Sequence, residues 1–170
     1  MPSESMPSND GELQQALGYS FREPALLTRA LTHSSHVNEA VQQLPATGEA
    51  VPLSDNERLE FLGDAVLGLV ICEHLFQLCP DQREGQLTQM KSWLVSRQTC
   101  ARVARALDLE PLIFVGRGLQ QIPEAILSAV IESLIAGIYF DGGLGAARTF
   151  IVMAFGEELR LCRPLDSENY

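Results

Sequence analysis

The sequence predicts an all-α fold, and three observations support this class. Apolar residues recur at helical spacing along most of the chain, and no stretch alternates with a period of two for long. Prolines and glycines gather in a few short segments between the periodic stretches. A length of 170 residues with a hydrophobic content of 46% fits one compact domain with a substantial core. We therefore expect a single domain of about six or seven helices.

The N-terminal part of the chain contains short periodic stretches between irregular segments. Residues 1–10 are rich in Ser and Pro and are expected to form a disordered N-terminal segment. Helical spacing begins at Gly11 and continues through residues 21–35. Residues 43–54 contain two prolines and a glycine and predict a loop. The folded domain is expected over residues 11–160, with residues 161–170 as the start of a linker.

A long helix is predicted after this loop, from about Asp55 to Leu78. Ser54 or Asp55 stands where the N-cap is expected, and Pro80 follows the end of the helix. The positions expected to face the core are Leu59, Leu62, Val66, Leu69 and Val70.

Three more helices are predicted in the C-terminal half. A second long helix runs from about Gly85 to residue 107. Its inward positions are Leu87, Met90, Leu94 and Val95. Residues 109–125 contain glycines and prolines and predict a break. The strongly apolar stretch after it predicts a helix that ends at Gly142–Gly143, and residues 144–161 predict the last helix.

The balance of charge is acidic, with 12 Lys and Arg against 22 Asp and Glu and a formal net charge of −10. It argues against simple electrostatic binding of nucleic acid, which normally uses a basic face. Apolar runs are interrupted before the ~20 residues of a membrane span, and the N-terminus does not resemble a signal peptide. Four cysteines without close pairing predict free, buried or half-buried thiols in a reducing cytoplasm: Cys72, Cys79, Cys100 and Cys162. We expect a cytoplasmic protein that is not attached to a membrane.

Three carboxylates share one face of the first long helix. Glu57, Glu60 and Asp64 stand at i, i+3 and i+7, with apolar residues between them. Like charges at this spacing repel one another, and a divalent cation such as Mg²⁺, which prefers oxygen ligands, would offset the repulsion. The alternative is a solvated acidic N-terminus that the helix dipole favours.

A fourth carboxylate, Glu132, lies in the middle of the strongly apolar helix. Burying an unpaired carboxylate is costly, so Glu132 is expected to face a cation or the rim of a cleft. Two helices that each offer inward carboxylates are a common way to hold metal ions in a helical bundle.

These residues belong to a longer pattern. The segment NERLEFLGDAVL, residues 56–67, resembles the signature of the ribonuclease III family of double-stranded RNA endonucleases. Three flanking segments resemble the family in consistent order: LTRALTHSSHVNE (27–39), EGQLTQMKSWLVS (84–96) and ILSAVIESLIAGIYFDGGLGAARTFI (126–151). The resemblance covers about Leu13 to Ile151, which corresponds to the whole catalytic domain of the family.

The resemblance implies a symmetric homodimer of all-α domains that cuts double-stranded RNA, in RNA processing, by Mg²⁺-assisted hydrolysis. Mn²⁺ is expected to substitute for Mg²⁺, and no organic cofactor is implied. Glu60, Asp64 and Glu132 fall on metal ligands of the family, and Asp64 and Glu132 are the expected catalytic pair. Glu57 and Glu84 fall on acidic positions that support the ligands or contact RNA.

The same resemblance places Phe61 on the family's dimer contact, although an ordinary core phenylalanine is the alternative. Basic residues near the site are candidates for contacts with RNA phosphates or, equally, members of a solvated face: Lys91, Arg97, Arg102, Arg105 and Arg117.

Two departures from the family pattern bear on activity. An aspartate is expected three residues before Glu132, but the residue there is Ala129, which cannot bind a metal. Ser128 points about 100° away on an ideal helix and is a poor substitute. The chain also has no basic segment corresponding to a double-stranded-RNA-binding domain. An impaired enzyme, or an inactive RNA-binding or ribosome-associated scaffold on the same fold, is therefore the alternative to an active endonuclease.

Overall fold

The computed structural model describes residues 10–43 and 54–162. Most of the predicted disordered segment 1–10, the predicted loop 43–54 and the predicted linker 161–170 lies outside these residues.

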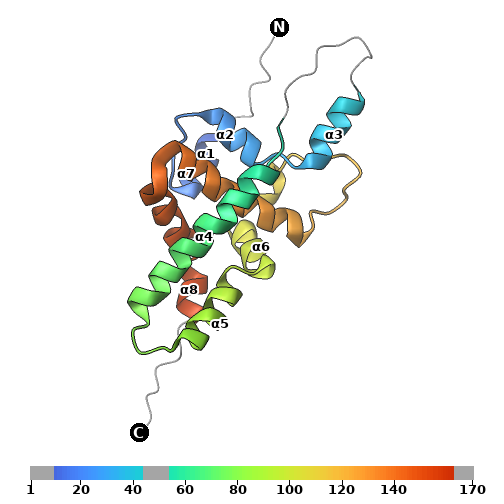
Figure 1. Ribbon diagram of the computed structural model, residues 1–170. Helices are drawn as coiled ribbons and strands as arrows, with labels where there is room; N and C mark the ends of the chain where they lie inside the picture. The colour runs from blue at the N-terminus through green and yellow to red at the C-terminus, as the bar shows by residue number, and fades with distance from the viewer. Residues whose placement is uncertain (1–9, 44–53, 163–170) are drawn as a thin grey trace.

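The predicted all-α class is confirmed over the described part of the chain (Figure 1). Its elements are α1 (Asp10–Leu17), α2 (Pro24–Ala30), α3 (Ser34–Gln42), α4 (Glu57–Leu78), α5 (Glu84–Leu94), α6 (Arg97–Ala106), the short 3₁₀ turn η1 (Glu110–Leu112), α7 (Glu124–Ala154) and α8 (Gly156–Cys162). The β-type pairing found among the described residues is one isolated parallel bridge between Thr32 and Phe114.

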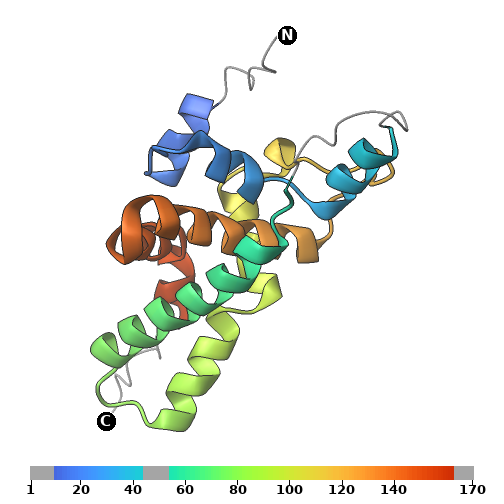
Figure 2. The same ribbon diagram turned by 45° about the horizontal axis from the view of Figure 1, so that its top comes forward.

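The helices α4 and α7 form the centre of the fold and pack directly against each other (Figures 1 and 2). The helices α6 and α2 also pack on α7. The core is built from aliphatic side chains of these helices and of α5, including Leu67, Ile71, Leu94, Ala104, Leu127, Ile131 and Ile135. The helix α7 is long and apolar enough to cross a membrane, but 67% of its most apolar window is buried inside the protein.

Helix boundaries differ from the sequence predictions at two junctions, which is why more helices form than expected. The helix predicted over residues 85–107 is two helices, because Ser96 is extended and its Oγ accepts a hydrogen bond from the Thr99 backbone N–H at 3.2 Å, as an N-cap does. The helix predicted over 144–161 is interrupted at Phe155, whose fully buried side chain places the junction at a core residue.

The predicted stop at Gly142–Gly143 is confirmed as a break in the helix, because α7 consists of two helical stretches joined by a kink at Gly143. Gly143 has φ 81° and ψ 179°, a conformation that residues with a side chain rarely adopt. The chain bends there and resumes as a helix up to Ala154.

The long helix α4 was predicted correctly in extent but not in every detail. Its N-cap position is Asn56 rather than Ser54 or Asp55, although Asp55 Oδ1 accepts a hydrogen bond from the Glu57 backbone N–H at 3.2 Å. Leu69, predicted to face the core, is 54% exposed. The helix is apolar on several sides, so spacing alone did not separate its buried face from its exposed one. Leu67 and Ile71 were missed and are fully buried.

The four cysteines are free thiols, as predicted. Cys79 and Cys100 are buried and Cys162 is half-buried, but Cys72 is exposed, which corrects the prediction for that residue. Cys72 lies on the outward face of α4, on the same side of the helix as the exposed ring of Phe76.

Asn56 ties the start of α4 to its neighbours. Its backbone N–H donates to the Thr32 carbonyl at 2.9 Å, and its side-chain Nδ2 donates to the Ala30 carbonyl at 3.2 Å. Its own carbonyl accepts a hydrogen bond from Ser133 Oγ on α7 at 3.1 Å. Because Asn56 is buried, these bonds also satisfy its polar groups while they hold the start of α4 against its neighbours.

Candidate active site

The predicted carboxylates come together where α4 crosses α7. Gly63 lies against the backbone of Glu132, so closely that a Cβ atom at position 63 would be 1.7 Å from the Glu132 carbonyl oxygen. Only a glycine permits this approach. The crossing places Glu60 and Asp64, which flank Gly63 on α4, beside the carboxylate of Glu132 on α7.

The electrostatics of the four carboxylates show this proximity. Glu57 and Asp64 are exposed, whereas Glu60 and Glu132 are half-buried. Burial raises the pKa of Glu132 to about 7, against the opposing hydrogen bond from Ser128, and the charges of Asp64 and Glu60 raise this pKa further. Burial and the neighbouring charge of Glu57 raise the pKa of Glu60. Two helices thus hold negative charges close together in a partly dry setting.

Residue 129 contributes no oxygen to this group. Ala129 is 6% exposed and lies one turn before Glu132 on the same side of α7. Ser128 does not take over as a fourth member, because its hydroxyl donates a hydrogen bond to Glu132 Oε1 at 3.1 Å.

The donor set suits a hydrated divalent cation. Its oxygens are carboxylates, which hard cations prefer, and their mutual repulsion would be relieved by positive charge. Within the described ranges, no three His, Cys, Asp or Glu side chains are arranged tightly enough to enclose a metal ion. Mg²⁺ usually keeps several waters and needs few protein ligands, so a closed cage is not required. The residues that would hold the ion are Glu60, Asp64 and Glu132.

Neutralising Glu132 is expected to stabilise the metal-free protein, and more strongly at pH 8 than at pH 5. The folded-state pKa of Glu132 is about 7, above its ordinary value of 4.5. The folded state therefore holds a proton that the unfolded state releases, and stability falls as pH rises through this window. A Glu132→Gln variant keeps a hydrogen-bond acceptor for Ser128, and its stability should not fall as pH rises through this window, because glutamine does not ionise. Thermal unfolding of both proteins in EDTA at the two pH values measures the difference.

The control for that measurement is Glu12→Gln, which neutralises an exposed carboxylate on α1, away from the crossing. It should change the melting temperature equally at both pH values. A Glu132→Gln protein whose advantage is the same at pH 5 and pH 8 would contradict the charge repulsion inferred at the crossing.

The predicted basic residues divide into two groups. Arg97, at the start of α6, lies close enough to lower the pKa of both Glu60 and Glu132, and His33 also lowers that of Glu60. Lys91 lies along α4 beside Gly68. Neither forms an ion pair within 4.0 Å among the residues that the structure describes.

The other three arginines have carboxylate partners. Arg102 binds Glu158 through two hydrogen bonds of 3.1 and 3.0 Å and stacks over the Trp93 ring at 5.2 Å. Arg105 pairs with carboxylates of η1 and α7. Arg117 is 3.7 Å from Glu39 through its Nε but keeps a largely exposed side chain. For Arg102 the pairing supports the structural alternative over a phosphate contact.

Glu84 is not brought to the carboxylate group. It begins α5 at the far end of α4 from Glu57, and its Oε1 accepts a hydrogen bond from Thr88 Oγ1 at 2.7 Å (Figures 1 and 2). It lines a small hollow with Cys72 and Phe76 instead.

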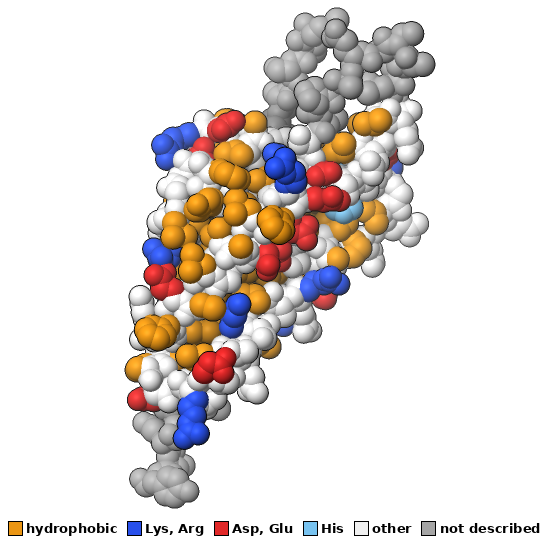
Figure 3. Space-filling model, viewed as in Figure 1, with side chains coloured by type: hydrophobic (Ala, Val, Ile, Leu, Met, Phe, Trp, Pro, Cys, Tyr) orange, Lys and Arg blue, Asp and Glu red, His pale blue; other side chains and the backbone are white. Residues whose placement is uncertain are grey.

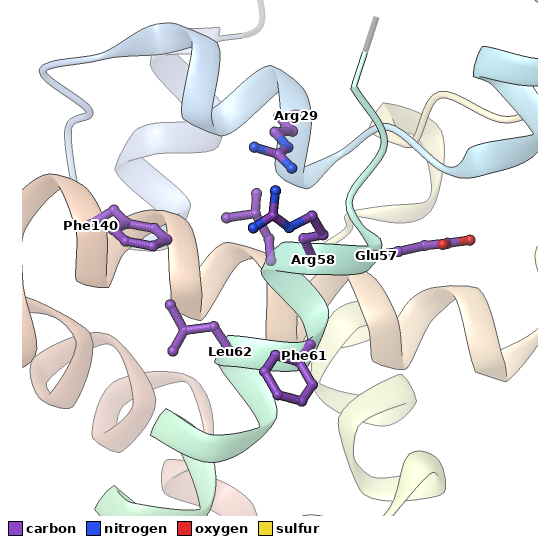
Figure 4. A pocket seen from close by; sticks show the side chains of 7 residues that line it. Arg29, Glu57, Arg58, Phe61, Leu62 and Phe140 are labelled. Carbon is purple, nitrogen blue, oxygen red and sulfur yellow. The ribbon is translucent and has the colours of Figure 1, made fainter.

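Phe61 is not a core residue, because its ring is 82% exposed. It lines a hollow of about 520 Å³ together with Leu62 and Phe140, with Arg29 and Arg58 on one side (Figure 4). Glu57 also lines the hollow, but its carboxylate extends away from Phe61 and Phe140 (Figure 4). Apolar side chains gather over this face of α4 and α7, and acidic side chains lie beside them along α4 (Figure 3).

Sequence reasoning missed the residues through which α4 contacts its neighbours. Gly63 carried one signal, a glycine in the interior of a long helix between two carboxylates. Asn56 and Ser133 carried none, because a buried backbone-to-side-chain bond between distant segments leaves no local pattern. Ser128 was weighed only as a ligand and rejected, and its hydrogen bond to Glu132 was not foreseen.

Comparison with known proteins gives one family. Residues 23–159 match the family described as ribonuclease-III-like. The chain is similar to the protein named Ribonuclease 3 of Rhodopirellula baltica, with 43% identity over 151 residues that cover 87% of this chain and 52% of that protein. A protein of the same name from Solibacter usitatus is 44% identical over 143 residues, which cover 82% of this chain and 52% of that protein. The chain spans about half the length of these curated relatives.

Solved structures agree with the sequence comparison. The nuclease domain of ribonuclease III from Campylobacter jejuni superposes with a TM-score of 0.75 and 32% identity, covering 89% of this chain and 96% of that one. A second structure of that domain, with a TM-score of 0.74, 31% identity and coverage of 88% and 97%, is described as flexible in a region involved in dimer formation. Dicer from Pichia stipitis shares the fold, with a TM-score of 0.58 and 18% identity over 86% of this chain and 63% of that one.

Proposed function

The chain belongs to the ribonuclease III family, and from this premise we propose that it is an endoribonuclease that cuts double-stranded RNA with the help of a divalent cation. The observation that supports the proposal is the close approach of α4 to α7 at Gly63, where the charges of Glu60 and Asp64 raise the pKa of Glu132. Mg²⁺ is the proposed ion, and Mn²⁺ is expected to replace it. Bound there, the ion would supply an activated water and stabilise negative charge on the reacting phosphate.

The residues of the chain have separate roles in this proposal. Asp64 and Glu60 on α4 and Glu132 on α7 would hold the cation. Glu57 adds negative charge beside Glu60, and Glu84 is left for contact with RNA. Arg97, which faces the carboxylates, is positioned to contact a phosphate once the cation neutralises them, and Lys91 and Arg117 extend the basic positions. No organic cofactor is needed. We propose that the protein processes RNA in a reducing cytoplasm, and the free thiols of its four cysteines are consistent with this location.

The test is cleavage of a long RNA duplex by the purified chain. Cleavage is expected with Mg²⁺ or Mn²⁺ and not in EDTA, and an Asp64→Asn variant should lose at least about a thousandfold in rate, because it removes a charged ligand without changing size. Duplex RNA that stays intact at saturating Mg²⁺ would remove the enzymatic proposal for this chain. Cleavage that survives Asp64→Asn would remove the assigned site.

The second candidate is a scaffold that binds double-stranded RNA, or associates with the ribosome, without cutting. The observation that favours it is Ala129, buried beside Glu132 where the family pattern has an aspartate. It predicts retention of an RNA duplex in a gel-shift experiment with no cleavage at any Mg²⁺ concentration. The cleavage test above separates the two candidates.

We also propose that the protein is a homodimer that uses Phe61. A ring this exposed beside an apolar hollow is typical of a surface that a partner covers. A Phe61→Asp variant is expected to weaken dimerisation by at least about thirtyfold, because buried aromatic anchors contribute 2 kcal/mol or more. Sedimentation velocity over a dilution series measures the change.

The control for dimerisation is Val41→Asp, which places the same charge on an exposed apolar position of α3, away from the hollow. It should leave the sedimentation behaviour unchanged. If Val41→Asp dissociates the protein and Phe61→Asp does not, the interface lies elsewhere.

A further inference from the structure

Ser128 makes an unusual hydrogen bond for a serine inside a helix. Such a hydroxyl commonly bonds back to the carbonyl four residues earlier. Ser128 instead donates forward to the carboxylate of Glu132, with 3.1 Å between Oγ and Oε1. Ser128 is 6% exposed, so little water competes for this bond.

The Glu132 carboxylate is the charged group that accepts a hydrogen bond from Ser128. Cys100, fully buried on α6, is a further polar side chain near Ser128. Among the described residues, the hydrogen bond of the Ser128 hydroxyl within 3.5 Å is the one to Glu132. The hydrogen bond reaches only Oε1, and Oε2 of Glu132 receives none from the described residues.

We propose that Ser128 is a positioning residue that holds the Glu132 carboxylate through Oε1 so that Oε2 is presented to a divalent cation between α4 and α7. The proposal deepens the proposed function and rests on it. Glu132 is the only carboxylate between Ile126 and Ile138, since residue 129 is alanine. A long, rotatable side chain that acts alone on its helix loses more rotamer freedom on binding a cation than one that is already held.

A matched control lies on the same helix. Ser133 is fully buried, and its Oγ donates a hydrogen bond of 3.1 Å as well, but to the carbonyl of Asn56. Ser133→Ala therefore removes a buried serine hydroxyl without touching the Glu132 carboxylate. Any loss that Ser128→Ala shows beyond Ser133→Ala belongs to the bond with Glu132.

The first measurement needs no metal. In protein labelled with ¹³C at glutamate carboxyls, the Glu132 signal is identified by its absence in Glu132→Gln. Ser128→Ala is expected to shift and broaden this signal, Ser133→Ala to leave it in place, and Ser128→Thr, which retains a hydroxyl, to restore it. A Glu132 signal that is unchanged in Ser128→Ala, or equally changed in both alanine variants, would overturn the proposal.

The second measurement is the affinity for Mn²⁺, followed by electron paramagnetic resonance. Ser128→Ala is expected to bind Mn²⁺ about tenfold more weakly than the unmodified chain. Loss of a group that orients a metal ligand lowers metal affinity by about 10- to 100-fold, and this expectation takes the smaller value. Equal affinities would overturn the positioning role. Failure of the unmodified chain to bind Mn²⁺ would instead overturn the metal site of the proposed function, and the carboxyl signal would still decide whether Ser128 orients Glu132.

Discussion

A Gly63→Ala substitution is expected to destabilise the protein by at least about 3 kcal/mol, more than a typical substitution on a helix. The added Cβ atom would lie 1.7 Å from the carbonyl oxygen and 2.4 Å from the carbonyl carbon of Glu132. Both are backbone atoms of α7, so no side-chain rotation can relieve the overlap. The two central helices would have to separate, which opens the core on both sides of the crossing.

Gly68 offers the matched control, since it lies in the same helix and also lacks a side chain. A Cβ atom there would be 3.7 Å from Cε of Lys91, an ordinary contact with a flexible side chain. Gly68→Ala should therefore be neutral or stabilise the protein by up to about 1 kcal/mol, through higher helix propensity. Urea unfolding followed by circular dichroism compares the variants. A Gly63→Ala protein as stable as Gly68→Ala would show that the helices do not meet at this point.

The contrast between these two glycines illustrates what sequence reasoning could reach. The spacing of Glu57, Glu60 and Asp64 on one helix face, and the isolation of Glu132 in an apolar helix, are local patterns, and both were visible in the chain. The contact between position 63 and the Glu132 backbone joins segments far apart in sequence. The place of Gly63 between two carboxylates is a local signal, but it does not show that another helix passes at that point.

The errors have the same physical origin. Leu69 was expected in the core because α4 is apolar on several sides, and only the placement of α7 decides which side is buried. The junction at Ser96 was missed because an N-cap inside a periodic stretch competes with helix continuation, and tertiary packing decides between them. Arg102 was left open between RNA contact and structure, and its partner Glu158 comes from the last helix of the described chain. Local patterns predicted the elements, and contacts between distant segments determined their details.

An Ala129→Asp substitution is expected to lower the stability of the metal-free protein and to raise Mg²⁺-dependent cleavage. Residue 129 is buried one turn from Glu132, so a new carboxylate there would add negative charge to a site where burial and neighbouring carboxylates already raise the pKa of Glu132 to about 7. We expect a loss of about 2–4 kcal/mol at pH 8 in EDTA, typical of a buried, unpaired charge. The melting temperature in EDTA measures it.

Mg²⁺ should reverse this loss, because a ligand that binds only the folded state stabilises it, by about 2.7 kcal/mol at a hundred times its dissociation constant. The restored fourth carboxylate should also raise the rate of duplex cleavage by at least about tenfold, which corresponds to 1.4 kcal/mol of additional transition-state stabilisation. The two readouts are independent, since one is measured without RNA. If Ala129→Asp is destabilised and Mg²⁺ rescues neither stability nor cleavage, the group at the crossing does not bind a cation and the scaffold interpretation gains. If the unmodified chain is inactive and Ala129→Asp with Mg²⁺ gains both stability and cleavage, the alanine at position 129 is the reason that the unmodified chain does not cut RNA.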